Sequence, residues 1–193
     1  MEDVPMKQKF TTKKIVLTGL LAALTCVGSA LRITLPLDIA GTTSFHLGNI
    51  LCALSGILLG PWWGGLAAGL GSAIYDMFNP LYISECWMTF LMKFAYGLAA
   101  GLVIRCGKAE NWGYIRALLA TIAGAAAYAV LYLAKSYFYS GLLLHGLTHE
   151  AALLTVIGKL PATGFNAAVA IIIAPVLALA IRKALHKQHL DVD

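Results

Sequence analysis

The sequence predicts an all-α membrane protein: one domain of six transmembrane helices with both termini in the cytoplasm. The chain has 193 residues, of which 60% are hydrophobic and only 12% are charged. Its mean hydropathy of +0.79 lies well outside the range of a soluble domain. Because about 20 apolar residues span a bilayer core and the polar loops are short, this length suits about six helices. No room remains for a soluble catalytic domain.

Apolar runs separated by helix breakers mark the six segments. They occupy about residues 14–33, 45–59, 62–78, 87–104, 114–139 and 151–185. Residues 1–13 are expected to form a cytoplasmic segment before the first helix, and residues 186–193 a cytoplasmic tail. The basic N-terminus superficially resembles a signal peptide, but no clear small-residue cleavage site follows the apolar run. The first helix is therefore expected to be retained.

The distribution of basic residues predicts the orientation. Ten of the fourteen Lys and Arg residues fall at the predicted inner ends: Lys7, Lys9, Lys13, Lys14, Arg105, Lys108, Arg116, Arg182, Lys183 and Lys187. The loops expected outside contain no Lys or Arg. The positive-inside rule therefore places both termini in the cytoplasm. The same clustering indicates contact with anionic membrane lipid, and we expect no nucleic-acid partner.

The second segment is too short to span the membrane by itself. Its apolar run, at 1.5 Å per residue, measures roughly 22 Å, against about 30 Å for the hydrocarbon core. Irregular backbone at that depth persists only when it is buried in protein or lines a wet cavity. Residues 36–46 are therefore expected to dip into an outward-facing recess, with a tilted neighbour or local bilayer thinning as the alternative.

Small residues punctuate the second, third and fourth segments. Gly60 is expected to end the second helix and Pro61 to begin the third, which makes a tight helical hairpin. Small residues also recur four apart, a spacing that lets helix backbones approach closely: Gly60 and Gly64, Gly65 and Gly69, Gly69 and Ala73, and Gly97 and Gly101. We favour packing within the chain over a partner interface for these pairs.

Four basic residues fall inside the predicted helices, in their outer half: Arg32, Lys93, Lys135 and Lys159. An ionisable group at membrane depth indicates a functional site. Four acids share that half: Asp38, Asp76, Glu85 and Glu150. Ion pairs that tie helices together are one explanation, but buried pairs are weak stabilisers. A polar site occupied by a ligand or water is the other, and the sign of the ligand's charge stays open.

Aromatic and hydrogen-bonding side chains fall in the same outer layer and suit a small planar or amphipathic solute. Tyr128, Tyr132 and Lys135 are spaced by four and three, so they share one helical face that should point inward. Tyr82, Trp87 and Tyr139 equally suit a membrane-interface belt. The candidate substrate-binding residues are His46, Asn49, Asp76, Asn79, Glu85, Trp87, Lys93, Tyr128, Tyr132, Lys135, Lys159 and Asn166.

No cofactor, metal site or catalytic group is expected. The four cysteines, Cys26, Cys52, Cys86 and Cys106, include no C-x-x-C pair, so neither a disulfide framework nor a zinc knuckle is indicated. His145, His149 and Glu150 could offer metal ligands, but Glu150 does not stand between the histidines as in H-E-x-x-H. The sequence has neither a G-x-x-x-x-G-K-[ST] loop nor a Ser/His/Asp arrangement, so ATP hydrolysis would require a partner.

Residues 47–76 carry LG-N followed by LLGPWWGGLAAGLGS-x-x-x-D, and a Trp-led fourth helix follows them. Together with the six-helix layout, this block resembles the substrate-binding S component of energy-coupling factor (ECF) vitamin transporters. The resemblance implies a multi-pass protein of a bacterial or archaeal plasma membrane that captures a vitamin or related micronutrient outside the cell. It also implies delivery through a transmembrane coupling protein and two ATP-binding cassette ATPases.

The resemblance further implies where the ligand and the partner bind. The family's pocket lies near the outer surface between the later helices, with loops as lids, and the whole subunit topples in the membrane to release its cargo inside. The small-residue face of the first helix meets the coupling protein. Its candidates here are Gly19, Ala22, Ala23 and Cys26, which depart from the family's usual Ala-x-x-x-Ala.

Two other functions stay open. A self-sufficient secondary transporter is the first, although the inverted half-repeats of many such folds are missing. An intramembrane metal-dependent enzyme using His145, His149 and Glu150 is the second, less favoured function. No residue pattern distinguishes among pyridoxine, a pyrimidine precursor, pantothenate, niacin, folate and a queuosine precursor as the solute.

Overall fold

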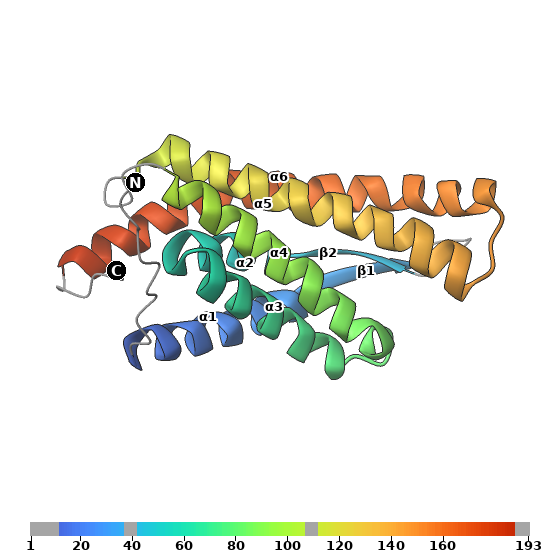
Figure 1. Cartoon of the computed structure of the whole chain (residues 1–193), viewed down its shortest axis with the longest axis horizontal. Coiled ribbons are helices and arrows are strands. Elements are labelled where there is room, and N and C mark those ends of the chain that lie inside the picture. The colour runs from blue at the N-terminus through green and yellow to red at the C-terminus, as the bar shows by residue number, and fades with distance from the viewer. Residues whose placement is uncertain (1–11, 37–41, 107–111, 188–193) are drawn as a thin grey trace, which may run out of the picture.

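The computed structural model describes residues 12–36, 42–106 and 112–187, and most of them are helical (Figure 1). The α-helices are α1 (Thr12–Ala30), α2 (Gly48–Leu59), α3 (Pro61–Met77), α4 (Cys86–Arg105), α5 (Tyr114–Lys135) and α6 (His149–Lys187). The short 3₁₀ helix η1 (Ile83–Glu85) precedes α4, and the π-helical segment η2 (Ser136–Leu144) continues α5. Strands β1 (Arg32–Pro36) and β2 (Thr42–His46) form an antiparallel pair between α1 and α2.

The β-hairpin corrects the prediction of an all-α fold. The first helix ends at Ala30 rather than near residue 33, and the second begins at Gly48 rather than 45. The strand register pairs Arg32 with His46 and Thr34 with Ser44, whose hydroxyl oxygens lie 3.3 Å apart. Thr, Ile and Phe at these positions favour extended backbone, a local preference that the apolar-run analysis overlooked.

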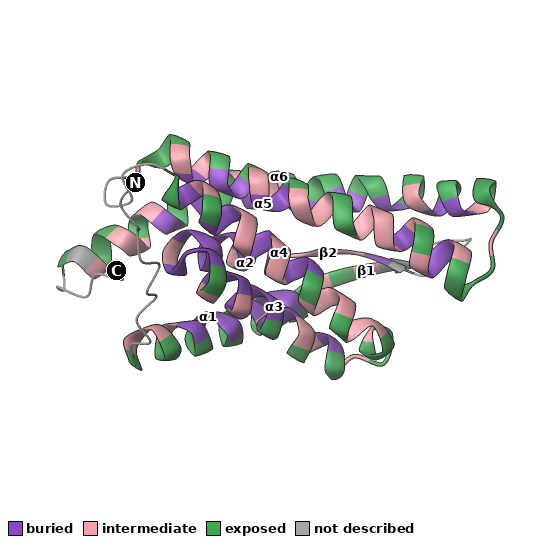
Figure 2. Cartoon of the chain, viewed as in Figure 1, coloured by how far each residue is buried: buried purple, intermediate pink, exposed green. Residues whose placement is uncertain are grey.

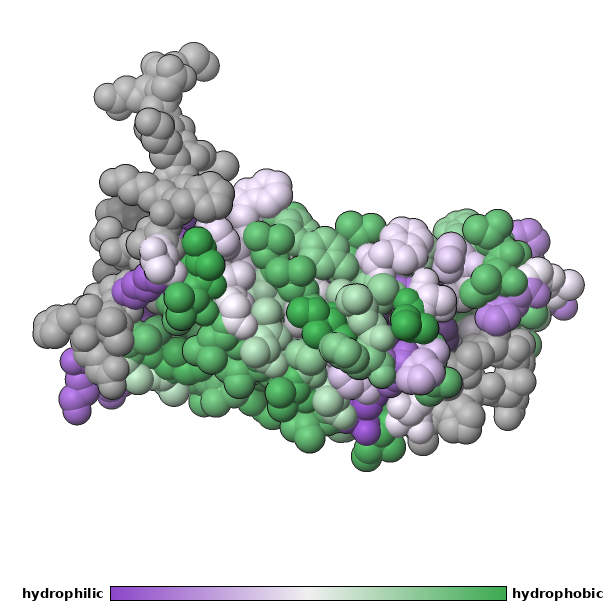
Figure 3. Space-filling view, turned by 90° about the horizontal axis from the view of Figure 1, so that it is seen from below, coloured by the Kyte–Doolittle hydropathy of each residue, from purple (hydrophilic) through white to green (hydrophobic). Residues whose placement is uncertain are grey.

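Four helical segments are long and apolar enough to cross a membrane: Thr12–Ala30, Ile83–Arg105, Tyr114–Leu144 and His149–Leu185. Gly48–Leu59 is apolar but shorter. Large apolar side chains are exposed along the helices, and hydrophobic residues cover most of the face in Figure 3, between hydrophilic groups at its two ends. An exposed apolar surface of this extent marks a membrane-embedded protein. The fold is therefore that of a multi-pass membrane protein.

Glycines bring α2, α3 and α4 into backbone contact, as their spacing predicted. A Cβ added at Gly97 would lie 2.6 Å from the carbonyl oxygen of Gly64, and one at Gly56 would lie 2.5 Å from that of Gly97. A Cβ at Gly101 would collide with the backbone of Pro61. Figure 2 shows the resulting concentration of buried residues in α2 and in the faces that surround it.

The connection between α2 and α3 confirms the predicted tight hairpin. Gly60 ends α2 with φ of 80°, a conformation that favours glycine, and Pro61 occupies the first turn of α3. The Arg105 side chain donates to the carbonyl oxygen of Leu59 at 3.4 Å. This contact places a cation at the C-terminal end of α2, where the helix dipole stabilises positive charge.

Candidate functional site

A cavity of about 340 Å³ opens between the hairpin, α3, α4, α5, η2 and α6. Nine of the twelve candidate residues line it: His46, Asp76, Glu85, Lys93, Tyr128, Tyr132, Lys135, Lys159 and Asn166. They come from β2, α3, η1, α4, α5 and α6. The fold therefore gathers side chains that are up to 120 residues apart in the sequence, such as His46 and Asn166. A cavity of this size with convergent polar groups suits a small solute.

Three candidates lie outside the cavity lining. Asn49 is buried behind it and accepts a hydrogen bond at Oδ1 from the ammonium of Lys93. Asn79 donates to the Tyr75 hydroxyl at 2.9 Å, and its Oδ1 accepts from the Leu81 backbone at 3.0 Å. Trp87 is 52% exposed. Asn49 and Asn79 therefore support residues of the site, whereas Trp87 lies on the surface.

Several lining residues were not among the candidates. Arg32, one of the four cations in the predicted helices, lines the cavity without being among the candidates. Tyr82 and His145, considered above for a membrane-interface belt and for a metal site, also line the cavity. The others carry small hydroxyl or apolar side chains: Ser29, Thr43, Ser44, Ser72, Leu81, Ser84, Thr89, Met92, Ser140, Leu144 and Thr163. Such residues are common in membrane helices as packing groups, so the sequence offered no signal that would single them out.

Arg32 occupies one side of the cavity and pairs with Asp76. Its guanidinium lies 3.7 Å from the Asp76 carboxylate, and its Nε donates to the Ser29 carbonyl oxygen at 2.7 Å. The guanidinium carbon also lies over two rings, 4.1 Å from the centroid of Tyr75 and 4.9 Å from that of Tyr82. Cation–π contacts and a carboxylate thus compensate this charge.

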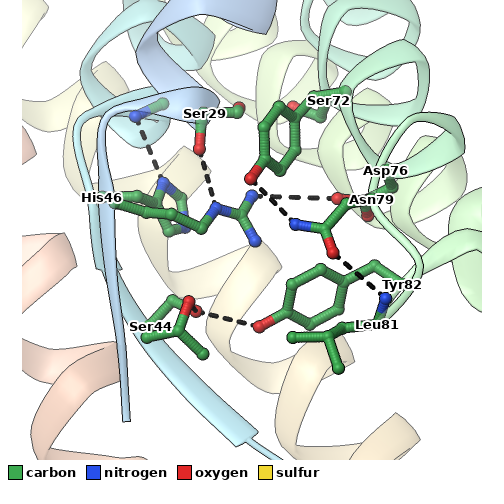
Figure 4. Close-up of polar contacts among 12 residues, drawn as sticks. Ser29, Ser44, His46, Ser72, Asp76, Asn79, Leu81 and Tyr82 are labelled. Atoms are coloured by element: carbon green, nitrogen blue, oxygen red, sulfur yellow. Dashed lines mark hydrogen bonds and ion pairs between the residues drawn. The ribbon is translucent and has the colours of Figure 1, made fainter.

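The Asp76 side of the cavity is tied to the hairpin through hydroxyl groups. Figure 4 shows Ser44 facing Tyr82, and their oxygens lie 3.0 Å apart. Asn79 and Leu81 lie beside them in the same view, joined by the hydrogen bond to the Leu81 backbone. The α3–η1 loop and β2 are therefore held together at the rim of the cavity.

Glu85 compensates a second cation. Its carboxylate forms an ion pair with Lys135 and accepts from the Ser140 hydroxyl at 3.3 Å. This group joins η1 to the end of α5 and to η2. Asp76 and Glu85 therefore each pair with a cation, as the ion-pair explanation of this charged layer requires. Glu150 lies in the first turn of α6 and is exposed, and Asp38 lies outside the described residues.

Among the described residues, Lys93 and Lys159 donate hydrogen bonds to neutral partners only. Lys93, 3% exposed, donates to Asn49 and lies 3.9 Å from the ring centroid of Tyr128. Lys159, 5% exposed, donates to the Ser136 hydroxyl at 3.2 Å and lies 5.6 Å from the ring centroid of Tyr132. Among the described residues, neither ammonium has a carboxylate within ion-pair distance.

Tyr128 and Tyr132 form the aromatic wall of the cavity. Their ring centroids lie 5.6 Å apart with an angle of 17° between the ring planes. Tyr96, which is fully buried, packs behind Tyr128 at 6.1 Å. Tyr128, Tyr132 and Lys135 share the inward face of α5, as their spacing predicted. A flat ring system is the chemistry that such a wall accommodates best.

His46 and Asn166 fix the hairpin against α6. The Asn166 amide accepts from the backbone N–H of His46 at 3.0 Å and donates to the carbonyl oxygen of Ser44 at 2.7 Å. His46 lies in β2, outside the candidate membrane spans, and burial, followed by the charges of Lys93 and Arg32, lowers its pKa well below the usual value. Its Nδ1 accepts from the Gly48 backbone at 3.2 Å, so the neutral ring carries its proton on Nε2.

The two histidines considered for a metal site, His145 and His149, have different surroundings. His145 lines the cavity, whereas His149 Nδ1 lies 2.6 Å from the Tyr137 hydroxyl. In the described part of the chain, no group of three or more His, Cys, Asp or Glu side chains is arranged to hold a metal ion.

The partner-binding candidates on α1 differ in exposure. Gly19 and Ala23 are exposed, and Cys26 is partly buried. Ala22 is buried, and a Cβ added at Gly71 of α3 would collide with its carbonyl oxygen. Ala22 therefore belongs to the α1–α3 contact rather than to the free surface of α1.

Comparisons with known proteins agree with this architecture. The family model described as "ECF-type riboflavin transporter, S component" matches residues 9–183. A Pyrococcus woesei protein described as "Uncharacterized protein in gap 3'region" is 30% identical over 119 residues, which cover 62% of this chain and 74% of that protein.

The fold is also similar to a solved structure, a 2.1 Å crystal structure of the S-component for biotin from an ECF-type ABC transporter. The TM-score is 0.61 at 14% identity, and the match covers 88% of this chain and 94% of that one. The family match over residues 9–183 includes nearly all of the described helices, so it agrees with the fold. The chain belongs to the ECF-type riboflavin transporter S-component family, whose members are substrate-binding transport proteins rather than enzymes.

Proposed function

We propose that this chain captures a vitamin or related small micronutrient in its cavity with high affinity, as the substrate-binding subunit of an ATP-driven ECF transporter. The observation that carries the proposal is the cavity itself: a stacked tyrosine pair and several buried charged groups around one space of about 340 Å³. The retained candidate contacts are His46, Asp76, Glu85, Lys93, Tyr128, Tyr132, Lys135, Lys159 and Asn166. Asn49 and Asn79 support them.

The cavity faces the outside of the plasma membrane in this proposal. With six membrane spans, both termini lie on the same side of the membrane. That side is the cytoplasm, because basic residues gather at the helix ends opposite the cavity. The hairpin, the α3–η1 loop and the η2–α6 loop then surround the outer entrance. Since release requires lower affinity in the inward-facing state, the partner complex must favour a conformation that distorts or reorients the cavity.

A transmembrane coupling protein and two ATP-binding cassette ATPases are the proposed partners. The exposed small residues of α1, Gly19 and Ala23, together with Cys26, are the proposed contact face. Large side chains at Gly19 and Ala23 should therefore reduce assembly with the coupling protein while leaving solute binding intact. Co-purification of the tagged chain with its partners measures the first, and calorimetric titration of the purified chain measures the second.

Riboflavin is the first solute to test, because the matching family is described by it. Native mass spectrometry of the chain purified from its host will identify any solute that remains bound. Lys159→Ala and Glu85→Ala should weaken the binding of that solute, whereas Lys183→Ala, an exposed lysine on the same helix as Lys159, should not. Unchanged affinity in both cavity variants would refute the assigned site.

Uptake experiments separate the proposed function from its alternatives. Deleting the partner ATPases in the host should abolish uptake of the retained solute. Uptake that survives this deletion would indicate a self-sufficient secondary transporter. Stoichiometric zinc in the purified chain would instead favour a metal-dependent enzyme.

A further inference from the structure

Building on the proposed function, we infer that the captured solute is a planar ring compound that carries an acidic group, a carboxylate or a phosphate, bound by Lys93 and Lys159. The charged side chains of the cavity indicate an acidic solute. Some of these charges are paired with an opposite charge of the protein, and the unpaired ones are available to a ligand.

The two acids of the cavity lining are already occupied. Asp76 pairs with Arg32 at 3.7 Å, and Glu85 pairs with Lys135 while also accepting from Ser140. Within each of these pairs the positive and the negative charge neutralise each other. Among the described lining residues, the pairs leave Lys93 and Lys159 as the cations without a carboxylate.

Both remaining lysines are buried more deeply than a lone ammonium normally is. Their exposed fractions are 3% and 5%. An ammonium out of water is costly unless an opposite charge or several hydrogen bonds replace the water. Each ammonium donates one hydrogen bond to a neutral oxygen, of Asn49 for Lys93 and of Ser136 for Lys159. Each ammonium has three N–H donors, so donors remain for an acidic group.

The positions of the two ammonium groups indicate a ring next to the acid. Lys93 lies against the Tyr128 ring, and Lys159 lies near the Tyr132 ring. Because those two rings are stacked on each other, both charges border one aromatic surface. A solute ring that packs on this surface brings a substituent acid within reach of the lysines. His46, Asn166 and Thr163 line the same space and offer further hydrogen-bonding groups.

Matched pairs of ring compounds test the charge. We would titrate the purified full chain with nicotinamide and nicotinate, pyridoxine and pyridoxine 5′-phosphate, and riboflavin and riboflavin 5′-phosphate. The acidic member of any pair that binds should bind at least tenfold more tightly, since a charge-assisted contact contributes about a ten- to hundredfold gain in affinity. The nicotinate arm reports a carboxylate site, and the two phosphate arms report a phosphate site.

Lysine variants locate the preference. Lys93→Met and Lys159→Met should each reduce or remove the preference for the acidic member, whereas Lys159→Arg, which keeps the charge, should preserve part of it. Lys183→Met removes the same charge from an exposed position on α6 and should leave the preference unchanged. The wild-type comparison of the paired compounds needs no variant, so the test stands even if a variant does not fold.

Equal or tighter binding of the neutral members would overturn the inference, and so would a preference that survives in both methionine variants. If no compound of the panel binds, the solute retained during purification decides: an acidic ring compound supports the inference, and a neutral one overturns it while the proposed function stands. No retained solute together with no binding would count against the proposed function itself, and the inference would fall with it.

Discussion

The two ends of α4 illustrate two opposite ways of using a membrane helix. Near its C-terminal end, Gly97 and Gly101 meet the backbones of α3 and of the α2–α3 turn, and nothing larger than hydrogen fits. One turn before Gly97, the same helix carries Lys93, a long charged side chain beside a cavity of about 340 Å³. One end is closed by backbone contact, and the other is kept open by large polar side chains.

This difference shows how a small membrane protein keeps a cavity without losing its fold. Lipid supplies no hydrophobic driving force between helices, so close van der Waals packing provides the association. The glycine contacts of α2, α3 and α4 concentrate that packing at one end. The cavity end can then carry ion pairs and unpaired lysines, which contribute little to stability or oppose it.

The largest expected effect is at the closed end. Gly97→Ala places a methyl group 2.6 Å from the Gly64 carbonyl oxygen. Because that oxygen belongs to the backbone of a packed helix, it cannot move aside. We expect a loss of about 2–3 kcal/mol of stability, seen as a lower thermal unfolding midpoint of the detergent-solubilised chain. Gly164→Ala, where nothing lies within 4 Å of the added Cβ, is the control. Equal midpoints for the two variants would show that the closed end is not tightly packed.

The next effect concerns the ion pairs of the open end. Asp76→Ala leaves the guanidinium of Arg32 without its carboxylate, and removal of one partner of a buried pair costs about 3 kcal/mol. The double change Arg32→Met with Asp76→Ala removes both charges and should cost less than the single change Asp76→Ala. Thermal unfolding of the two single variants and the double variant forms a double-mutant cycle. Additive losses would show that the two charges do not interact.

Much of the closed end could be predicted from the sequence. The signals there are local patterns with one dominant physical consequence each. Gly60 adopts a positive φ, Pro61 starts a helix, and glycines spaced four apart let helix backbones approach closely. The orientation rests on the distribution of basic residues along the whole chain and stays a prediction.

The open end was predictable only in part. The cations were visible because a charge in an apolar run is conspicuous, but their partners lie 23 to 50 residues away in the sequence, as Ser136 does from Lys159 and Glu85 from Lys135. Asn166 was expected to contact solute, yet its amide also binds the β2 backbone, because that strand needs a partner for its free edge. The hairpin itself went unpredicted since five-residue strands are weak signals beside apolar helices.

A smaller effect is expected at the aromatic wall. Tyr132→Leu keeps an apolar group but removes the flat surface that stacks on Tyr128. We expect the tightest-binding ring compound of the panel to lose about three- to tenfold in affinity, measured by calorimetric titration, with little change in the unfolding midpoint. Phe78→Leu, at an 85% exposed ring, is the matched control. If the control loses as much affinity as the wall variant, the stacked pair is not the binding surface.

The smallest effect should come from Trp87, which the sequence placed among the binding residues. Its ring packs edge-on against Tyr139 at 6.2 Å and is 52% exposed, as suits a belt residue near the membrane interface. Because it does not line the cavity, Trp87→Leu should change the affinity by less than about twofold, in keeping with the independence of sites that share no partner. A loss as large as that of Tyr132→Leu would mean that the bound state brings Trp87 over the cavity. The open end would then close around its solute, and the contrast between the two ends of α4 would hold only for the empty protein.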